Sequence, residues 1–287
     1  MLKRVLGIVH RQRWADLDPP FEKTIYLSQG ASLWLILSRR GNPETFVKFS
    51  RLVSLEVEAE RCGLASQSFP DHAPQFIGHH QDDELHVLAS RAEQFRTVTA
   101  TMTESANDAQ AVRRGLVGYF KQQSLQIQAA HAPAATEWLQ RLEAYYADHD
   151  LARIARQSLG EVRAQLSNLP VARQHGDLVM NNLGLRPSGG LIVFDWEDFG
   201  EIGLPGLDLF TLEFSFEHES SRARAQGQRS HPDKYLDLAA CCEAQRLSVA
   251  GYHALRVAHA LAFLYLKRNY GPEIQGRLRE HILSLAG

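Results

Sequence analysis

The change of hydrophobic pattern along the chain constrains the fold more than any other feature of the sequence. Before residue 90, short runs rich in β-branched and aromatic residues alternate with polar turns, which is typical of antiparallel strands. A helical run at about residues 52–65 interrupts them, and from about residue 107 the apolar residues recur at helical spacing. We therefore expect an α+β protein, with a small antiparallel-sheet lobe containing one helix at residues 1–95 and a larger, mostly helical lobe at residues 96–287. The strands are expected at residues 23–28, 32–38, 45–49, 75–80 and 84–89, and the later helices at residues 108–130, 136–147, 151–168, 235–246 and 249–267.

Composition is that of an ordinary globular enzyme, with 44 % hydrophobic and 22 % charged residues in a chain of 287. The formal net charge of −2 favours neither a nucleic-acid nor an anionic-membrane partner. Cys62, Cys241 and Cys242 lack the spacing of a disulfide framework or a metal site, which fits a reducing cytoplasm. The most apolar stretch, residues 260–266, is too short to span a bilayer. We expect a cytoplasmic enzyme, and the sequence leaves its oligomeric state open.

The segment from His175 to Asp195 carries the clearest chemistry. Two short apolar runs, residues 183–186 and 191–194, flank the turn residues 187–190 and predict a β-hairpin. Counting outward from a four-residue turn pairs Arg186 with Leu191 and puts Asn182 opposite Asp195, with Cβ atoms roughly 5 Å apart. An amide oxygen and a carboxylate so placed suit Mg²⁺. Because phosphoryl transfer needs such a metal and a carboxylate to orient the attacking hydroxyl, Asp177 is the candidate catalytic base, and Asn182 and Asp195 are the candidate metal ligands.

Three motifs of this region resemble those of the aminoglycoside phosphotransferase and choline kinase superfamily, which has the protein-kinase-like two-lobe fold. His175-Gly-Asp-Leu-x-x-x-Asn182 resembles its catalytic loop, Phe194-Asp-Trp-Glu197 its metal-binding motif, and Gly203-x-Pro-x-x-Asp-Leu209 its downstream structural motif. Gly176 and Trp196 favour small-molecule kinases over protein kinases. The resemblance implies an ATP- or GTP-dependent, Mg²⁺-dependent kinase whose acceptor is a small-molecule hydroxyl, with Asp177 and Asn182 as catalytic residues.

The nucleotide is expected to bind in the first lobe. No Gly-Lys dipeptide occurs, so a Walker-type phosphate loop is excluded. The resemblance instead implies phosphate contacts from Gly30 and Ser32 and from Lys48, a lysine in an otherwise apolar strand. It also implies a backbone hinge for the base at residues 88–91. The partner of Lys48 is a glutamate on the following helix, where Glu56, Glu58 and Glu60 compete; we choose Glu58, which shares a face with Leu55 and Cys62.

Other residues near these motifs are expected to be structural. His175 is predicted to be buried and to hydrogen-bond the catalytic loop. Glu197 and Asp208 are predicted to accept hydrogen bonds from the backbone N–H groups of that loop. The acceptor site stays open, because the acidic and phenylalanine residues between positions 198 and 219 fit either a cationic acceptor site or a core with a solvated face. Two other functions compete with the kinase. One is a catalytically silent kinase-like nucleotide-binding protein; the other is a metal-dependent hydrolase that uses His175, Asp177, Asp195 and Asp208, although no second histidine has metal-site spacing.

Overall fold

The computed structural model describes residues 1–15, 17, 21–27, 32–99, 102, 105–127, 133–227 and 235–287. Contacts divide the chain into two compact units, one formed by Met1–Arg96 and Gly184–Glu197 and the other by Thr97–Leu183 and Asp198–Gly287. The segment Gly184–Glu197, which we had expected in the second lobe, therefore groups with the first unit. The functional division at residue 95 stays a prediction.

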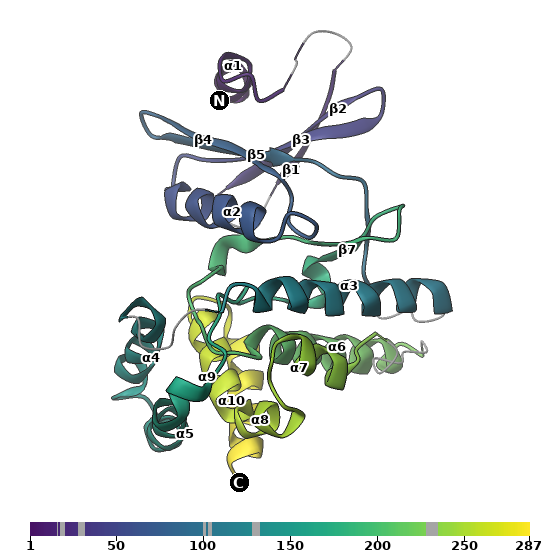
Figure 1. The fold of residues 1–287 in the computed structure, drawn as a ribbon. Helices are drawn as coiled ribbons and strands as arrows, with labels where there is room; N and C mark the ends of the chain where they lie inside the picture. The colour runs from purple at the N-terminus through teal and green to yellow at the C-terminus, as the bar shows by residue number, and fades with distance from the viewer. Residues whose placement is uncertain are drawn as a thin grey trace. The chain divides into compact units, whose positions relative to one another are not determined.

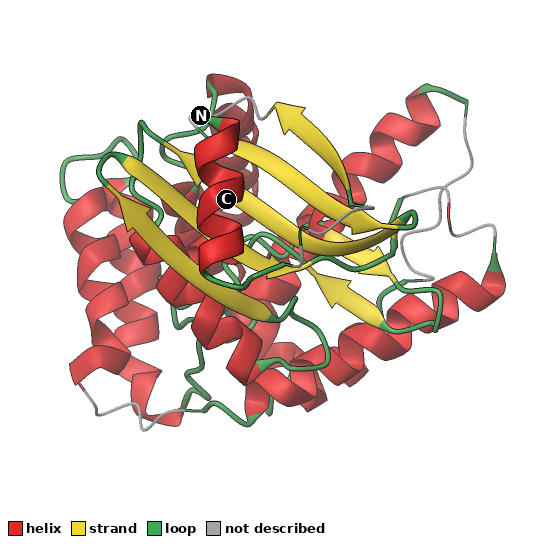
Figure 2. Cartoon of the chain, turned by 90° about the horizontal axis from the view of Figure 1, so that it is seen from above, coloured by secondary structure: helices red, strands yellow, loops and turns green. Residues whose placement is uncertain are grey.

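The first unit is built on a five-stranded antiparallel sheet of order β1-β2-β3-β5-β4 (Figures 1 and 2). This architecture confirms the expected antiparallel sheet, and each strand overlaps its expected range. The last two strands do not follow chain order in the sheet: β5 lies between β3 and β4 and is therefore paired on both sides. The strands are β1 (Glu22–Leu27), β2 (Leu33–Arg39), β3 (Asn42–Ser50), β4 (Phe76–Asp82) and β5 (Leu85–Arg91).

Helices cover both faces of this sheet, whereas we had expected one helix. On one face, α1 (Leu2–Arg11) packs its buried Ile8 and its neighbours against the core that contains Val87 of β5. On the other face, α2 (Glu56–Ser68) packs Ala59 against Leu88. Figure 1 shows the two helices on opposite sides of the sheet. Successive strand residues point to opposite faces, so Val87 of β5 packs on the side of α1 and Leu88 on the side of α2, and the first five residues of β5 are buried.

A second sheet of order β6-β7-β8 contains the predicted hairpin. It is formed by β6 (Arg96–Thr97), β7 (Leu183–Leu185) and β8 (Leu191–Val193). The Gly189 N–H donates to Arg186 O at 2.9 Å and the Arg186 N–H donates to Gly190 O at 2.8 Å, with Gly189 at φ 84°. This is a three-residue loop closed by a left-handed glycine. The expected four-residue loop was therefore wrong by one residue. The count outward from the turn that placed Asn182 opposite Asp195 no longer holds.

The second unit is helical, as expected, and α9 (Arg256–Leu266) is its central helix. Every residue of α9 from Ala258 on is buried, and the helix packs against α4, α5, α6, α8 and α10. We had expected a single helix over residues 249–267, but the chain breaks at Leu255 into α8 and α9. The other helices are α3 (Ala106–Ser124), α4 (Pro133–Tyr146), α5 (Ala152–Gln165), α6 (Leu207–Ala225), α7 (Leu238–Ala244), α8 (Val249–Ala254) and α10 (Pro272–Ala286), with short 3-10 turns at Leu166–Asn168, Met180–Asn182 and Trp196–Asp198.

The phenylalanines of α6 belong mostly to the core of the second unit, which was the plainer of the two readings. Phe210 and Phe216 are 1 % and 2 % exposed. Glu213 accepts a hydrogen bond from the Tyr252 hydroxyl, so this acid is engaged within the unit. In the part of the chain that the structure describes, no helix has both the length and the apolarity to cross a membrane.

Candidate active site

The loop that carries Asp177 is fixed to α6 by a fully buried carboxylate. Asp208 accepts hydrogen bonds from the backbone N–H groups of His175 at 2.8 Å and Gly176 at 2.9 Å. The Tyr119 hydroxyl and the Gln123 amide donate to it as well, at 2.8 Å and 2.7 Å. A buried carboxylate is costly unless such donors satisfy it. These contacts confirm that Asp208 holds the loop through its backbone.

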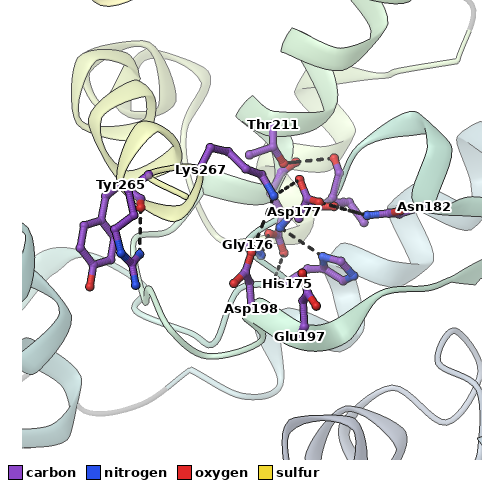
Figure 3. Close-up of polar contacts among 12 residues, drawn as sticks. His175, Gly176, Asp177, Asn182, Glu197, Asp198, Thr211, Tyr265 and Lys267 are labelled. Carbon is purple, nitrogen blue, oxygen red and sulfur yellow. Dashed lines mark hydrogen bonds and ion pairs between the residues drawn. The ribbon is translucent and has the colours of Figure 1, made fainter. Parts of the chain in front are cut away.

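Two further side chains of α6 continue this attachment. The Thr211 hydroxyl (Figure 3) donates to Leu178 O at 3.1 Å. The Ser215 hydroxyl accepts from the Met180 N–H at 2.7 Å. Side chains from the first three turns of α6 therefore hold the loop on both sides of Asp177.

Gly176 and His175 fit the loop for different reasons. Gly176 has φ 88°, and a Cβ atom there would lie 3.0 Å from the Asp198 Cβ atom, so a larger residue would be strained in its backbone and tightly packed. His175 is fully buried, and its Nδ1 accepts a hydrogen bond from the Asp177 N–H at 3.2 Å. This confirms the structural role expected for His175. It also weighs against the hydrolase, since His175 and Asp208 are both engaged with backbone N–H groups of the loop.

The Asp177 carboxylate is held at both oxygens (Figure 3). Its Oδ1 lies 2.9 Å from the Lys267 ammonium and its Oδ2 lies 3.3 Å from the Asn182 amide nitrogen. That nitrogen also donates to Asp177 O at 2.9 Å. The Asp177 side chain is 12 % exposed, so it is nearly buried yet reachable. Lys267 was missed by our reading of the sequence, which offers no motif around it.

The orientation of Asn182 suits the predicted metal role. Its amide nitrogen faces Asp177, which leaves the amide oxygen as the atom that a cation would meet. A hard oxygen of this kind fits Mg²⁺. The participation of Asn182 in a metal site together with Asp195 stays a prediction.

In the first unit, Lys48 is surrounded by carboxylates. Its ammonium lies 2.8 Å from both carboxylate oxygens of Glu58 and 3.7 Å from Glu197. Burial opposes the charge on this ammonium, but Glu58, Glu197 and Asp195 outweigh burial and raise the pKa of Lys48. Burial also raises the pKa of Glu58, in spite of Lys48. Of the three competing glutamates, Glu58 is thus the one that pairs with Lys48, whereas Glu197 faces Lys48 instead of the loop backbone that we expected it to bind.

Asp195 occupies an unusual backbone position. Its φ is 63°, in the left-handed region that few residues other than glycine, asparagine and aspartate adopt. The neighbours on both sides are anchored within the first unit. Phe194 packs on Phe95 with ring centroids 4.2 Å apart, and the Trp196 indole donates to Val193 O at 2.8 Å. Its neighbours therefore fix where the Asp195 carboxylate lies, close enough for its charge to act on Lys48.

The other residues expected at the nucleotide site are Gly30, Ser32 and the segment 88–91. Gly30 lies outside the described residues, while Ser32 directly precedes β2 and is buried. The hinge expected at residues 88–91 was wrong, because this segment lies in β5 and pairs with both β3 and β4. The sheet pairing uses backbone groups of this segment, which are therefore not free to bind a base.

Comparison with known proteins places this geometry in a family. A model of the phosphotransferase enzyme family (APH) matches residues 46–235. The chain is similar to the crystal structure of choline kinase LicA from Streptococcus pneumoniae, with 14 % identity, a TM-score of 0.56, and coverage of 99 % of this chain and 98 % of that one. It is also similar to ADP-bound aminoglycoside phosphotransferase APH(2'')-Ib, with 14 % identity, a TM-score of 0.55 and 98 % coverage of both chains.

A third similar structure is the Plasmodium vivax ethanolamine kinase Pv091845, with 9 % identity, a TM-score of 0.61, and coverage of 99 % of this chain and 88 % of that one. Comparison with curated proteins gives no match. These low identities show a shared fold, and the family model adds membership because it spans more than half of the chain, from β3 to Tyr235. The chain belongs to the phosphotransferase enzyme family and has its kinase-like fold.

Proposed function

We propose that the protein is a cytoplasmic small-molecule kinase that transfers the γ-phosphoryl group of ATP or GTP to a hydroxyl group of an aminoglycoside-, amino-alcohol- or sugar-like acceptor. The observation that carries the proposal is the Asp177 carboxylate, held at both oxygens on a loop that Asp208 fixes. Family membership supports the reaction class. The choline, ethanolamine and aminoglycoside kinases of similar fold support a small hydroxyl acceptor.

The proposal gives the chain's own residues three roles: a catalytic base, phosphate contacts and metal ligands. Asp177 orients the acceptor hydroxyl and accepts its proton as the oxygen–phosphorus bond forms and the bond to the bridging oxygen breaks, which releases the nucleoside diphosphate. Lys48, held by Glu58, contacts the α- and β-phosphates, with Gly30 and Ser32 as further phosphate contacts. Asn182 and Asp195 are the residues that would hold Mg²⁺, which neutralises phosphate charge when it is bound.

An acceptor screen tests the proposal. Purified protein is incubated with Mg²⁺ and γ-labelled ATP or GTP and with aminoglycosides, amino alcohols or sugars, and transfer of label to the acceptor is measured. We expect transfer to at least one class. Transfer to none of these classes, with no labelled phosphate released to water, would contradict the proposal.

The Asp177→Asn variant tests the role of Asp177 in the chemical step. It removes the base while keeping the size of the side chain, so we expect turnover to fall about 10³-fold or more, with the Kd for Mg-nucleotide unchanged within a factor of about two. Calorimetric titration with Mg-ATP measures that Kd. Wild-type turnover in the variant would refute the role of Asp177.

Nucleotide titration also separates the kinase from a silent relative. The kinase requires binding that depends on Mg²⁺, and Asp195→Asn should weaken it because a carboxylate ligand is lost. Mg-dependent binding without transfer to any acceptor would instead favour a catalytically silent nucleotide-binding protein.

A further inference from the structure

Lys267 is a buried ammonium beside the candidate base. It follows α9 directly, far from Asp177 in sequence, and its side chain is only 4 % exposed. The ammonium lies 2.9 Å from Asp177 Oδ1 and 3.8 Å from Asp198 Oδ2 (Figure 3). The Tyr270 ring lies over it, with the centroid 4.3 Å away. Two carboxylates of the second unit therefore share one buried cation.

The surroundings keep this ammonium charged. Burial alone disfavours the charge, but Asp177, Tyr270 and Asp198 outweigh burial and raise the pKa of Lys267. The carbonyl end of α9 adds a favourable field for a cation. A charged lysine inside a protein is costly unless it has such partners. A hydrophobic residue would satisfy the core at lower cost, so the position calls for an explanation beyond packing.

The anchor of Lys267 is rigid. Its N–H donates to Phe263 O at 3.0 Å, which continues the hydrogen bonding of α9, and α9 is the central helix of the second unit. Since α6 fixes the loop backbone and α9 fixes the ammonium, the Asp177 carboxylate lies between two rigid supports. Asn182 holds the other carboxylate oxygen. The orientation of the Asp177 carboxylate is therefore fixed before an acceptor binds.

We infer that Lys267 is a positioning residue for phosphoryl transfer, which fixes the orientation of the Asp177 carboxylate toward the acceptor hydroxyl. The inference rests on the proposed kinase function. Without the ammonium, Asp177 Oδ1 loses its cation, and the carboxylate can rotate away from the hydroxyl that it must orient.

The test compares Lys267→Met with Arg268→Met, which removes the same charge from the next, exposed position, where Arg268 stacks on Tyr265. Turnover is measured with Mg-ATP and the acceptor found in the screen, or with water as acceptor if none is found. For Lys267→Met we expect kcat to fall about 100-fold or more, with the KM for Mg-ATP unchanged within about twofold. Arg268→Met should match the wild type.

A double variant guards against a protein that fails to fold. Lys267→Met with Asp198→Asn keeps the summed charge of the cluster and removes the like-charge pair, so it should fold while kcat stays low because the carboxylate is no longer held. Lys267→Arg should recover part of kcat, because a guanidinium can still contact Asp177 Oδ1. If kcat of Lys267→Met and of the double variant equals that of the wild type, the inference fails while the kinase stands. If the wild type itself transfers no phosphoryl group to any acceptor or to water, the proposed function fails instead.

Discussion

At the scale of single residues, a few buried polar side chains decide the geometry of the catalytic loop. Asp208 gathers four donors, two from the loop backbone and two from α3. Burial and the charge of Asp208 raise the pKa of Tyr119, which therefore remains a donor. One carboxylate thus binds two successive backbone N–H groups of the loop and is itself held by two donors of α3.

Asp208→Asn should lower the free energy of unfolding by about 2–4 kcal/mol, because an amide group replaces one carboxylate oxygen and turns a donor toward another donor. Tyr119→Phe is the graded control. It removes one hydroxyl and leaves the carboxylate three donors, so about 1 kcal/mol is expected. Urea unfolding measures both values. Equal losses in the two variants would contradict the central role of Asp208.

Residue roles differed in how far the sequence could predict them. Glu58 was identified as the partner of Lys48 because helical spacing puts it on the face of Leu55, and spacing within one helix is local information. Lys267 could not be identified, because its contact with Asp177 depends on how α9 packs in the second unit. No local pattern encodes a contact between residues so distant in the chain.

At the scale of elements, the helix α1 and the hairpin show where sequence patterns fall short. Val5, Ile8 and Val9 recur at helical spacing, so the signal for α1 was present, but it is short and precedes a β-rich region. The hairpin was correctly placed, yet its loop was counted as four residues. A left-handed Gly189 closes the turn one residue earlier, and sequence alone does not say which of two adjacent glycines takes that conformation.

Ile8→Ala tests whether α1 is an integral layer of the first unit. Ile8 is fully buried against the sheet, so we expect a loss of about 2–4 kcal/mol in the free energy of unfolding. Lys3→Ala, an exposed position on the same helix, should change that free energy by less than about 0.5 kcal/mol. Chemical denaturation of the two variants gives the comparison, and similar values would mean that α1 is dispensable.

At the scale of the whole molecule, a buried histidine makes the free energy of unfolding depend on pH. His259 of α9 is fully buried, and its Nε2 donates to Pro205 O at 2.8 Å, just before the start of α6. Burial, opposed by this hydrogen bond and assisted by Arg256, lowers the pKa of His259 to about 4 from its ordinary 6.5. The neutral ring therefore supports the segment that presents Asp208 to the loop.

The sign of the pH effect follows from this pKa. Between pH 6.5 and 4 the unfolded chain binds a proton at His259 that the folded chain does not, so stability falls as the pH falls. The loss approaches about 3 kcal/mol over this window. His259→Gln should flatten the dependence of the unfolding free energy on pH between 7 and 5, whereas His10→Gln, at an exposed position, should not. Parallel curves for wild type and His259→Gln would exclude this origin.

The left-handed backbone at Asp195 limits which substitutions the chain tolerates there. Aspartate satisfies both the backbone and the predicted metal chemistry, whereas glycine satisfies the backbone alone and asparagine keeps an oxygen ligand without its charge. Each of these two replacements is one base change away from an aspartate codon. A lineage could therefore lose metal binding in a single mutational step and keep its fold, which makes Asp195 the position at which an active enzyme of this kind and a silent descendant would be easiest to tell apart.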